Sequence, residues 1–180
     1  MKTNLVLHTH RLTLIPLSAA QLSLALQDES VLAADLGLSL VPELITPPVR
    51  HAITIKLGKM ADAPPADLAW YTYWLIVVEQ DGKRTGAGMV GFKGAPDIAG
   101  SVEIGYGIDL AFRGKGYMTE AVRAMIDWAF QHKQCRVVTA SVVLKSNPAS
   151  SRVLLKVGMT LSDEDQETFS YQLNKEDWEG

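Results

Sequence analysis

The segment from Arg113 to Met118 carries the most specific chemical signal in this sequence. It reads Arg-Gly-Lys-Gly-Tyr-Met, and a strongly helical pattern follows it. Glycines allow the backbone to turn its N–H groups toward one point, and the N-terminus of a helix adds a dipole that favours an anion. We therefore expect a strand, a loop and a helix in succession, forming a site that suits a pyrophosphate.

Two other phosphate-binding motifs fit this chain less well. A P-loop requires Ser or Thr after Gly-Lys, but Gly114-Lys115 is followed by Gly116. The pattern Gly-x-Gly-x-x-Gly of dinucleotide sites occurs at residues 86–91, but Phe-Lys-Gly-Ala-Pro follows it in place of a helical pattern. We interpret residues 86–91 as a glycine-rich strand, so an oxidoreductase that binds a nucleotide there is a weak alternative.

Other reactive side chains indicate no further site. The four histidines show no metal-ligand spacing, and we expect no metal. Cys135 is the only cysteine, which excludes an internal disulfide, fits a reducing compartment and is typical of a small core residue. Trp70, Tyr71, Tyr73 and Trp74 are interpreted as packing residues of a strand and the core.

The bulk composition is that of a globular enzyme-sized domain. The chain has 180 residues, 47% of them hydrophobic and 21% charged, so we expect residues 1–180 to form a single domain. A net charge of -3 argues against nucleic acid as a partner. No apolar run reaches the roughly 20 residues of a membrane span, and polar residues interrupt the N-terminus before a signal sequence develops. We expect a cytoplasmic protein with no membrane partner.

The elements that would position the loop can be placed by periodicity and breakers. We expect strands over residues 11–17, 71–79, 85–93, 102–108, 136–144 and 168–173. We expect helices over residues 18–28, 116–132 and 147–158, with short helices across residues 28–60. In the helix after the loop, Glu120, Arg123 and Asp127 are predicted to form a solvated charged face. The order predicts an α/β protein with a mixed sheet and helices on both faces.

Three segments in this order resemble one family. Residues 102–106, Val-Glu-Ile-Gly-Tyr, precede the loop, and residues 147–154, Asn-Pro-Ala-Ser-Ser-Arg-Val-Leu, lead to Gly158-Met159. Residues 101–159 resemble the GNAT superfamily of N-acetyltransferases, in its RimJ/RimL-like branch, and residues 9–14 resemble the first strand of that branch. The pyrophosphate motif of the family is Gln/Arg-x-x-Gly-x-Gly/Ala, so Met118 departs from it and must fit where little room is expected.

The resemblance implies a GNAT fold with a central, mostly antiparallel sheet. It implies transfer of an acetyl group from acetyl-CoA, by direct attack, to a primary amine of a protein N-terminus or a small molecule. A non-catalytic acyl-CoA-binding module is the alternative. The chain could also form a homodimer. The resemblance assigns contacts with the acyl donor to Ile108, Leu110, Arg113, Gly114, Lys115, Gly116, Tyr117, Met118, Thr119, Asn147 and Ser150.

Acyl transfer to an amine needs a base for the amine and a proton for the leaving thiolate. Glu103 is the candidate base, because strand alternation places it on one face with Gly105 and Gly107, although a solvated strand glutamate would look the same. Asn147 before a proline is a strong helix N-cap, and in the family it also lies near the pantetheine arm. The resemblance makes Ser150 a candidate proton donor or thiolate stabiliser. Tyr106 and Tyr117 are alternatives for that role, although Tyr106 is expected in the core.

The acceptor cannot be identified from the sequence. Residues 28–66 contain no interpretable motif, but their apolar residues could either wall an acceptor pocket or pack onto the sheet. The apolar residues in question are Val31, Leu32, Leu36, Leu38, Leu40, Val41, Leu44 and Ile45. The carboxylates of Asp28, Glu29, Asp35 and Glu43 could attract a cationic amine to the rim.

Overall fold

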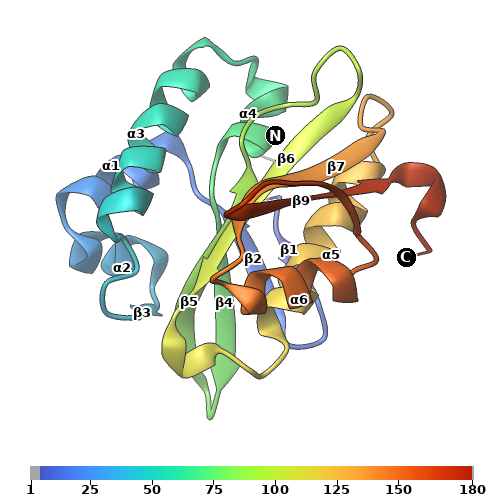
Figure 1. Ribbon diagram of the computed structural model, residues 1–180. Coiled ribbons are helices and arrows are strands. Elements are labelled where there is room, and N and C mark those ends of the chain that lie inside the picture. The colour runs from blue at the N-terminus through green and yellow to red at the C-terminus, as the bar shows by residue number, and fades with distance from the viewer. Residues whose placement is uncertain (1–4, 180) are drawn as a thin grey trace.

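The computed structural model describes residues 5–179, and a large mixed sheet runs through this part of the chain (Figure 1). Within the described residues the sheet has nine strands, in the order β1-β2-β4-β5-β6-β7-β9-β8, with β3 paired to β5. The strands are β1 Leu7–His8, β2 Leu12–Pro16, β3 Ser39–Leu40, β4 Trp74–Gln80, β5 Lys83–Phe92, β6 Ser101–Ile108, β7 Val137–Leu144, β8 Thr160–Glu164 and β9 Thr168–Asn174.

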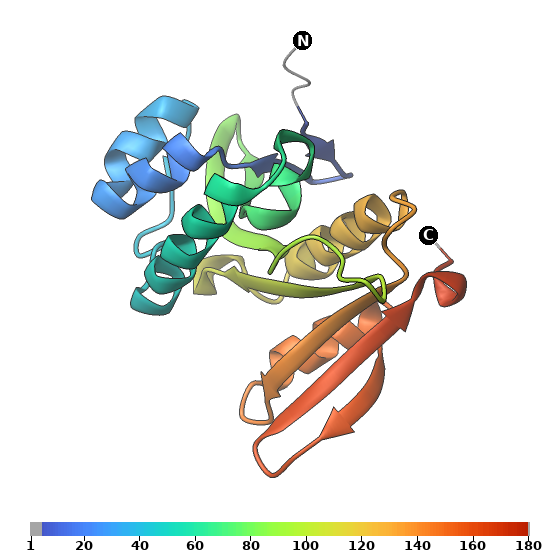
Figure 2. The ribbon, with the colours of Figure 1, turned by 90° about the horizontal axis from the view of Figure 1, so that it is seen from above.

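Most neighbouring strands are antiparallel, but β6 and β7 run parallel. Their recorded pairing covers only residues 101–103 of β6 and 137–139 of β7, although β6 continues to Ile108. The two strands therefore separate after Glu103 and Thr139. Figure 2 shows the result, with β7, β9 and β8 extending away from the rest of the sheet. This separation leaves room for a ligand between β6 and the α6 region.

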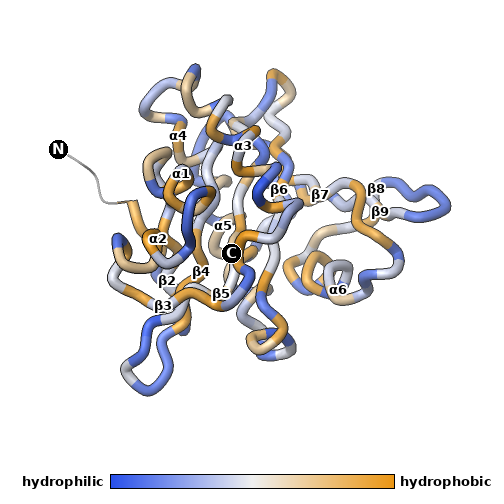
Figure 3. Tube along the Cα trace, turned by 90° about the vertical axis from the view of Figure 1, so that its left-hand side faces the viewer, coloured by the Kyte–Doolittle hydropathy of each residue, from blue (hydrophilic) through white to orange (hydrophobic). Residues whose placement is uncertain are grey.

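Helices cover both faces of the sheet, as the sequence predicts. Their bounds are α1 Ala19–Gln27, α2 Glu29–Leu36, α3 Pro47–Asp62, α4 Leu68–Tyr71, α5 Tyr117–Phe130 and α6 Pro148–Lys156. The apolar side chains of α1, α2 and α3 form one core with one face of β4 and β5. Helices α5 and α6 belong to a second core, and Figure 3 shows α6 with β7–β9 set apart from α1–α4.

Local signals explain where the helices begin. Ser18 and Gln21 form a capping box at α1, and Asp28 caps α2 by accepting from the Ser30 amide at 2.7 Å. The pair Pro47-Pro48 opens α3, where the missing N–H groups of proline cost nothing. These starts agree with the sequence-based expectations.

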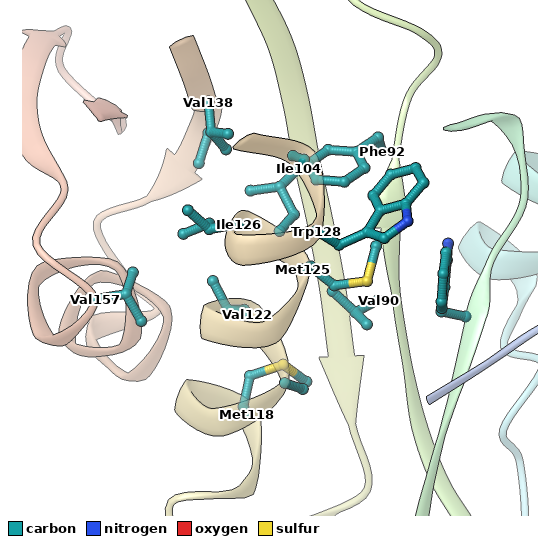
Figure 4. Close-up of a cluster of buried hydrophobic side chains, with 14 of the residues drawn as sticks. Val90, Phe92, Ile104, Met118, Val122, Met125, Ile126, Trp128, Val138 and Val157 are labelled. Carbon is teal, nitrogen blue, oxygen red and sulfur yellow. The ribbon is translucent and has the colours of Figure 1, made fainter. Parts of the chain in front are cut away.

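The core beneath α5 fixes the helix that follows the phosphate loop. Figure 4 shows Met118, Val122, Met125 and Ile126 of α5 packed against apolar side chains of the sheet. Trp70 and Trp74 are fully buried nearby, which confirms their predicted packing role, and Cys135 is buried as expected. Burial raises the pKa of the Cys135 thiol to about 11, so this residue is not a nucleophile.

Several expectations about the elements were wrong. Residues 68–71 are helical because they complete the turn after α3, so β4 begins only at Trp74. The insertion contains a 16-residue helix, α3, in place of short helices alone. Strand β8 was missed because its residues Thr160–Glu164 are all exposed and show no alternation. The charged face of α5 is also not fully solvated, since only 18% of the Glu120 side chain is exposed.

Candidate functional site

The loop between β6 and α5 presents backbone N–H groups. Gly114 and Gly116 have φ angles of 73° and 82°, a region that favours glycine. The Glu120 amide donates to the Gly116 carbonyl at 3.1 Å, which is the first hydrogen bond of α5. In the described part of the chain, the N–H groups of residues 114–119 have no recorded protein acceptor. A cluster of free donors at a helix N-terminus is a site for an anion.

A pocket of about 240 Å³ opens beside this loop, between the end of β6 and helix α6. It is lined by Tyr106, Gly107, Ile108, Phe112, Arg113, Gly114, Gly116, Tyr117, Met118, Thr119, Asn147, Ala149, Ser150, Arg152, Val153 and Lys156. Three of these residues, Arg113, Arg152 and Lys156, are cationic. Within the described part of the chain, no acidic residue lines the pocket. The electrostatics of the pocket therefore suit a ligand with several negative charges.

Nine of the sequence-predicted site residues meet in this pocket. They are Ile108, Arg113, Gly114, Gly116, Tyr117, Met118, Thr119, Asn147 and Ser150. Leu110 and Lys115 lie on the same loop but are not among the lining residues, and 74% of Leu110 is exposed. The Met118 side chain is buried in the core under α5 (Figure 4), so the methionine does not narrow the loop.

Tyr106 of β6 and Ser150 of α6 form a hydrogen-bonded pair in the lining of the pocket. Their hydroxyl oxygens are 3.0 Å apart, and Tyr106 Oη also lies 3.1 Å from the Ser150 carbonyl oxygen. Burial raises the pKa of the Tyr106 phenol to about 12; the hydrogen bond with Ser150 acts in the opposite direction, and Tyr171 raises the pKa further. Tyr106 therefore keeps its proton at neutral pH. Tyr106 packs against the core, as expected, but it is only partly buried and also lines the pocket.

Asn147 occupies the N-cap position of α6, as expected. Its side-chain oxygen accepts from the Ser150 amide at 3.4 Å. Tyr117 is buried, and its hydroxyl oxygen accepts from the Gln80 side chain at 3.0 Å. The Tyr106 hydroxyl is therefore better placed than that of Tyr117 for chemistry in the pocket.

Glu103 lies away from this pocket, on the other face of β6. Its carboxylate is 2.5 Å from the Lys93 ammonium, and it lines a more open groove between α3 and β6. Gly105 and Gly107 follow on the same face, and a Cβ atom added to either would meet nothing within 4 Å. Space beside the carboxylate is thus present, but an internal cation holds the carboxylate.

Sequence reasoning missed two cations that line the pocket, Arg152 and Lys156. Both come from α6, and their i, i+4 spacing places them on one face of the helix. Because the sequence predicts a helix after Asn147, this spacing could have identified both cations as neighbours on one helix face. Among residues 5–179, no cluster of three or more metal-ligating side chains is found, and no helix is long and apolar enough to span a membrane.

The fold is that of an α/β protein whose parallel strands β6 and β7 diverge beside a pocket lined by three cations. The chain belongs to the acetyltransferase (GNAT) domain family, which it matches over residues 11–160. The resemblance to the GNAT superfamily that the sequence motifs indicated is therefore confirmed.

Curated relatives match part of the chain. The uncharacterized N-acetyltransferase YjdG of Bacillus subtilis is 33% identical over 94 residues, covering 52% of this chain and 54% of the relative. The probable N-acetyltransferase YjcK of the same organism is 47% identical over 55 residues, covering 31% and 30%. The matches thus span about half or less of these relatives.

Solved structures show the same fold over almost the whole chain. The ribosomal-protein-S5-alanine acetyltransferase of Vibrio fischeri has a TM-score of 0.67 at 17% identity, covering 98% of this chain and 100% of that one. RimL, a ribosomal L7/L12 alpha-N-protein acetyltransferase solved with coenzyme A, has a TM-score of 0.65 at 18% identity, covering 94% and 98%. At these identities the likeness supports the GNAT fold alone.

Proposed function

We propose that this protein transfers an acetyl group from acetyl-CoA to a primary amine. The observation that supports this most directly is the pocket beside residues 113–119, where free N–H groups and three cations meet the Tyr106–Ser150 pair. A pyrophosphate would accept from the loop amides, and the thioester end would lie near Tyr106 between the parted strands. Nine of the site residues named from the sequence line this pocket, which supports the proposal.

The Tyr106–Ser150 pair supplies the proton that the leaving group needs. Attack of the amine nitrogen on the thioester carbon forms the new C–N bond, and the C–S bond then breaks to release a thiolate. Tyr106 Oη donates its proton to that sulfur and is reprotonated through Ser150 or solvent. A thiol has a pKa of about 8.5, so protonation of the thiolate favours release of CoA at neutral pH.

Glu103 is proposed as the group that removes the proton from the acceptor amine. Its carboxylate faces the open side of β6, next to Gly105 and Gly107, where a substrate can approach without steric conflict. For this role Lys93 must give up the carboxylate or the proton must pass through water. The Lys93 side chain is 62% exposed, so its movement away from Glu103 costs little packing.

The acceptor is proposed to be an amine that enters end-first, carried by a small molecule or a short N-terminal segment. The groove at Glu103 lies between α3 and β6, and α3 belongs to the apolar insertion. Of that insertion, Leu32, Val41, Leu44 and Ile45 are buried in the core, so they support the wall and do not line it. Asp28, Glu29 and Asp35 accept hydrogen bonds from neutral amide groups, which leave their negative charges in place, so they stay candidates for attracting a cationic amine.

The test is thiol release from acetyl-CoA in the presence of peptide N-termini, polyamines, amino acids and aminoglycosides, with intact folded proteins as a further arm. Turnover with one class of free or N-terminal amine is expected. Tight CoA binding with no turnover of any amine would favour the alternative, a non-catalytic acyl-CoA-binding module. Modification of internal lysines in folded proteins alone would contradict end-first entry while leaving acetyl transfer in place.

A further inference from the structure

The N-terminal segment of the chain holds a carboxylate on the first turn of α5. Glu120 accepts from the Thr9 hydroxyl at 2.6 Å and from the Arg11 amide at 2.8 Å. It also accepts from Nε of Arg11 at 2.7 Å, and Nη2 of Arg11 is 2.7 Å away. Both guanidinium nitrogens contact the same oxygen, Oε2, while Oε1 accepts from the Thr9 hydroxyl and the Arg11 amide, so both carboxylate oxygens are held by charge-assisted or backbone hydrogen bonds.

The same guanidinium reaches the phosphate loop. Nη1 of Arg11 donates to the Lys115 carbonyl oxygen at 2.8 Å, and the guanidinium carbon lies 4.7 Å from the centre of the Tyr117 ring. A Cβ atom added to Gly116 would lie 3.2 Å from Nη2 of Arg11. Arg11 therefore packs directly against the loop while Glu120 and Thr9 fix its own position.

The held carbonyl determines which way one loop amide points. No described peptide bond is cis, so the Lys115 carbonyl and the Gly116 N–H lie on opposite sides of one planar peptide. With the carbonyl bound to Arg11, the Gly116 N–H is turned away from Arg11, and Gly116 is one of the residues that line the pocket. A rotated peptide would place a carbonyl oxygen in this position, where it would repel a phosphate.

We propose that Arg11 is a positioning residue that preorganises the pyrophosphate-binding loop from outside the pocket, with Glu120 as its anchor. This inference rests on the proposed function, since it concerns the donor site of an acetyl-CoA-dependent enzyme. The Arg11–Glu120 ion pair also explains how a carboxylate can be present in the first turn of a helix whose N-terminus is proposed to bind an anion. The charge of Arg11 compensates that of Glu120. Preorganisation improves affinity by reducing the cost of ordering the loop on binding.

The titration behaviour of the anchor agrees with this geometry. Burial raises the pKa of the Glu120 carboxyl, but hydrogen bonds from Thr9 and Arg11, together with the charge of Arg11, outweigh burial and leave the pKa below its ordinary value. The carboxylate therefore stays ionised and keeps Arg11 in place throughout the neutral range. By comparison, the Lys145–Glu164 pair lies on the surface and contacts no part of the loop.

The experiment compares two acyl donors in wild-type protein and in Arg11→Gln. Acetyl-CoA carries the pyrophosphate, whereas S-acetylpantetheine has the same thioester arm without it. We expect Arg11→Gln to raise KM for acetyl-CoA and Kd for CoA about tenfold, as expected for the loss of roughly 1.4 kcal/mol. The kcat value and the turnover of S-acetylpantetheine should stay at wild-type level. A merely structural role would lower the use of both donors equally.

Related variants keep the test decisive. Glu120→Gln should show a smaller loss for acetyl-CoA, and Arg11→Lys should be intermediate, because one ammonium cannot serve the carboxylate and the carbonyl together. Arg50→Gln is the matched control, since Arg50 also donates to a backbone carbonyl, that of Leu26, but in the layer of α1 and α3. It should leave CoA affinity unchanged. Arg11→Lys serves in the measurement if Arg11→Gln fails to fold.

The outcomes separate this inference from the proposed function. Wild-type protein that binds CoA no better than pantetheine would overturn the pyrophosphate site itself. Wild-type protein that prefers CoA, with equal preference in folded Arg11→Gln, would overturn the positioning role and leave the donor site standing. Selective loss with acetyl-CoA supports the role of Arg11.

Discussion

The two faces of β6 differ in the interactions that their polar side chains make in the absence of substrates. On the side of α6, Tyr106 and Ser150 pair in a pocket lined by cations, and Tyr106 is neutral with a proton to donate. On the side of α3, the carboxylate of Glu103 forms an ion pair with Lys93. The ammonium group of Lys59 donates a hydrogen bond to the Lys93 backbone carbonyl oxygen at 2.8 Å. One face is prepared for an anion before any ligand arrives, while the other must rearrange.

This difference indicates how the two substrates would be handled. The proposed donor carries fixed negative charge, so a preformed site of amides and cations would bind it with little reorganisation. The acceptor must lose a proton before attack, and its groove is lined by the acids Asp62 and Glu103 together with Lys59 and Lys93. A cationic amine would therefore compete with Lys93 for the carboxylate of Glu103.

The largest effect is expected from blocking the donor side. Gly116→Val should abolish the rise in melting temperature that acetyl-CoA produces by mass action, because the side chain would meet Arg11 and strain a backbone at φ 82°. NADH and ATP should produce little shift in either protein. Gly58→Ala is the control, since a Cβ atom there meets nothing within 4 Å, and it should leave the shift intact. Tight binding of NADH and none of CoA would contradict the assignment of the loop.

The next effect concerns the proton donor. Tyr106→Phe should lower kcat on the order of 10²- to 10³-fold with acetyl-CoA affinity nearly unchanged, the usual range for a lost general acid. Because the pKa of Tyr106 is about 12, the loss should be the same at about pH 7 and about pH 9. Ser150→Ala should cost less, since water can replace one hydroxyl. A Phe variant with full kcat would assign the proton to solvent.

The α3 side is tested by Glu103→Gln. We expect kcat to fall about 10²-fold, within the range for a general base, with the affinity for acetyl-CoA unchanged. Lys93→Ala tests whether Lys93 competes with the acceptor for the carboxylate of Glu103. If it does, the variant should be more active with cationic amines than the wild type. Full kcat in Glu103→Gln from about pH 6 to about pH 9 would leave Glu103 as a surface partner of Lys93 and move the base elsewhere.

Much of the donor side could be predicted from local sequence. The Gly114 and Gly116 turn, the apolar stripe of α5 and the N-cap at Asn147 depend on residues close together in the chain, and each is confirmed as structure. Their catalytic and binding roles stay predictions. Membership of the GNAT family followed from three motifs in order.

The contacts that could not be predicted join residues far apart in sequence. Tyr106 meets Ser150 across 44 positions, and Arg11 meets Glu120 across 109. A helical pattern shows that Glu120 is not core, but it does not show which other segment approaches that turn. Lys93 reaches Glu103 because the antiparallel pairing of β5 with β6 places Phe92 opposite Ile104, so the residue after Phe92 lies beside Glu103. That contact could be predicted only once the register of the two strands was known.

The smallest effect concerns Lys56, which lies on the α3 side behind the ion pair of Glu103. Its ammonium is buried and donates to the Phe92 carbonyl oxygen at 2.6 Å. Burial, followed by repulsion from Lys59 and Lys93, lowers its pKa from 10.5 to about 7. Between about pH 7 and about pH 10 the unfolded chain therefore binds more protons than the folded one, and the free energy of unfolding should rise with pH.

Lys56→Met should remove this rise, which chemical denaturation at about pH 7 and about pH 9 would measure. Cys135 and Tyr106 act in the opposite direction, because their raised pKa values make the folded state lose stability as the pH rises above their ordinary values of 9.0 and 10.0. Both groups remain in Lys56→Met, so the difference between the variant and the wild type isolates the contribution of Lys56. Lys93→Ala should move the onset of the rise to higher pH, since one repelling charge is gone. An onset that stays in place would show that Lys93 and Lys56 are electrostatically independent.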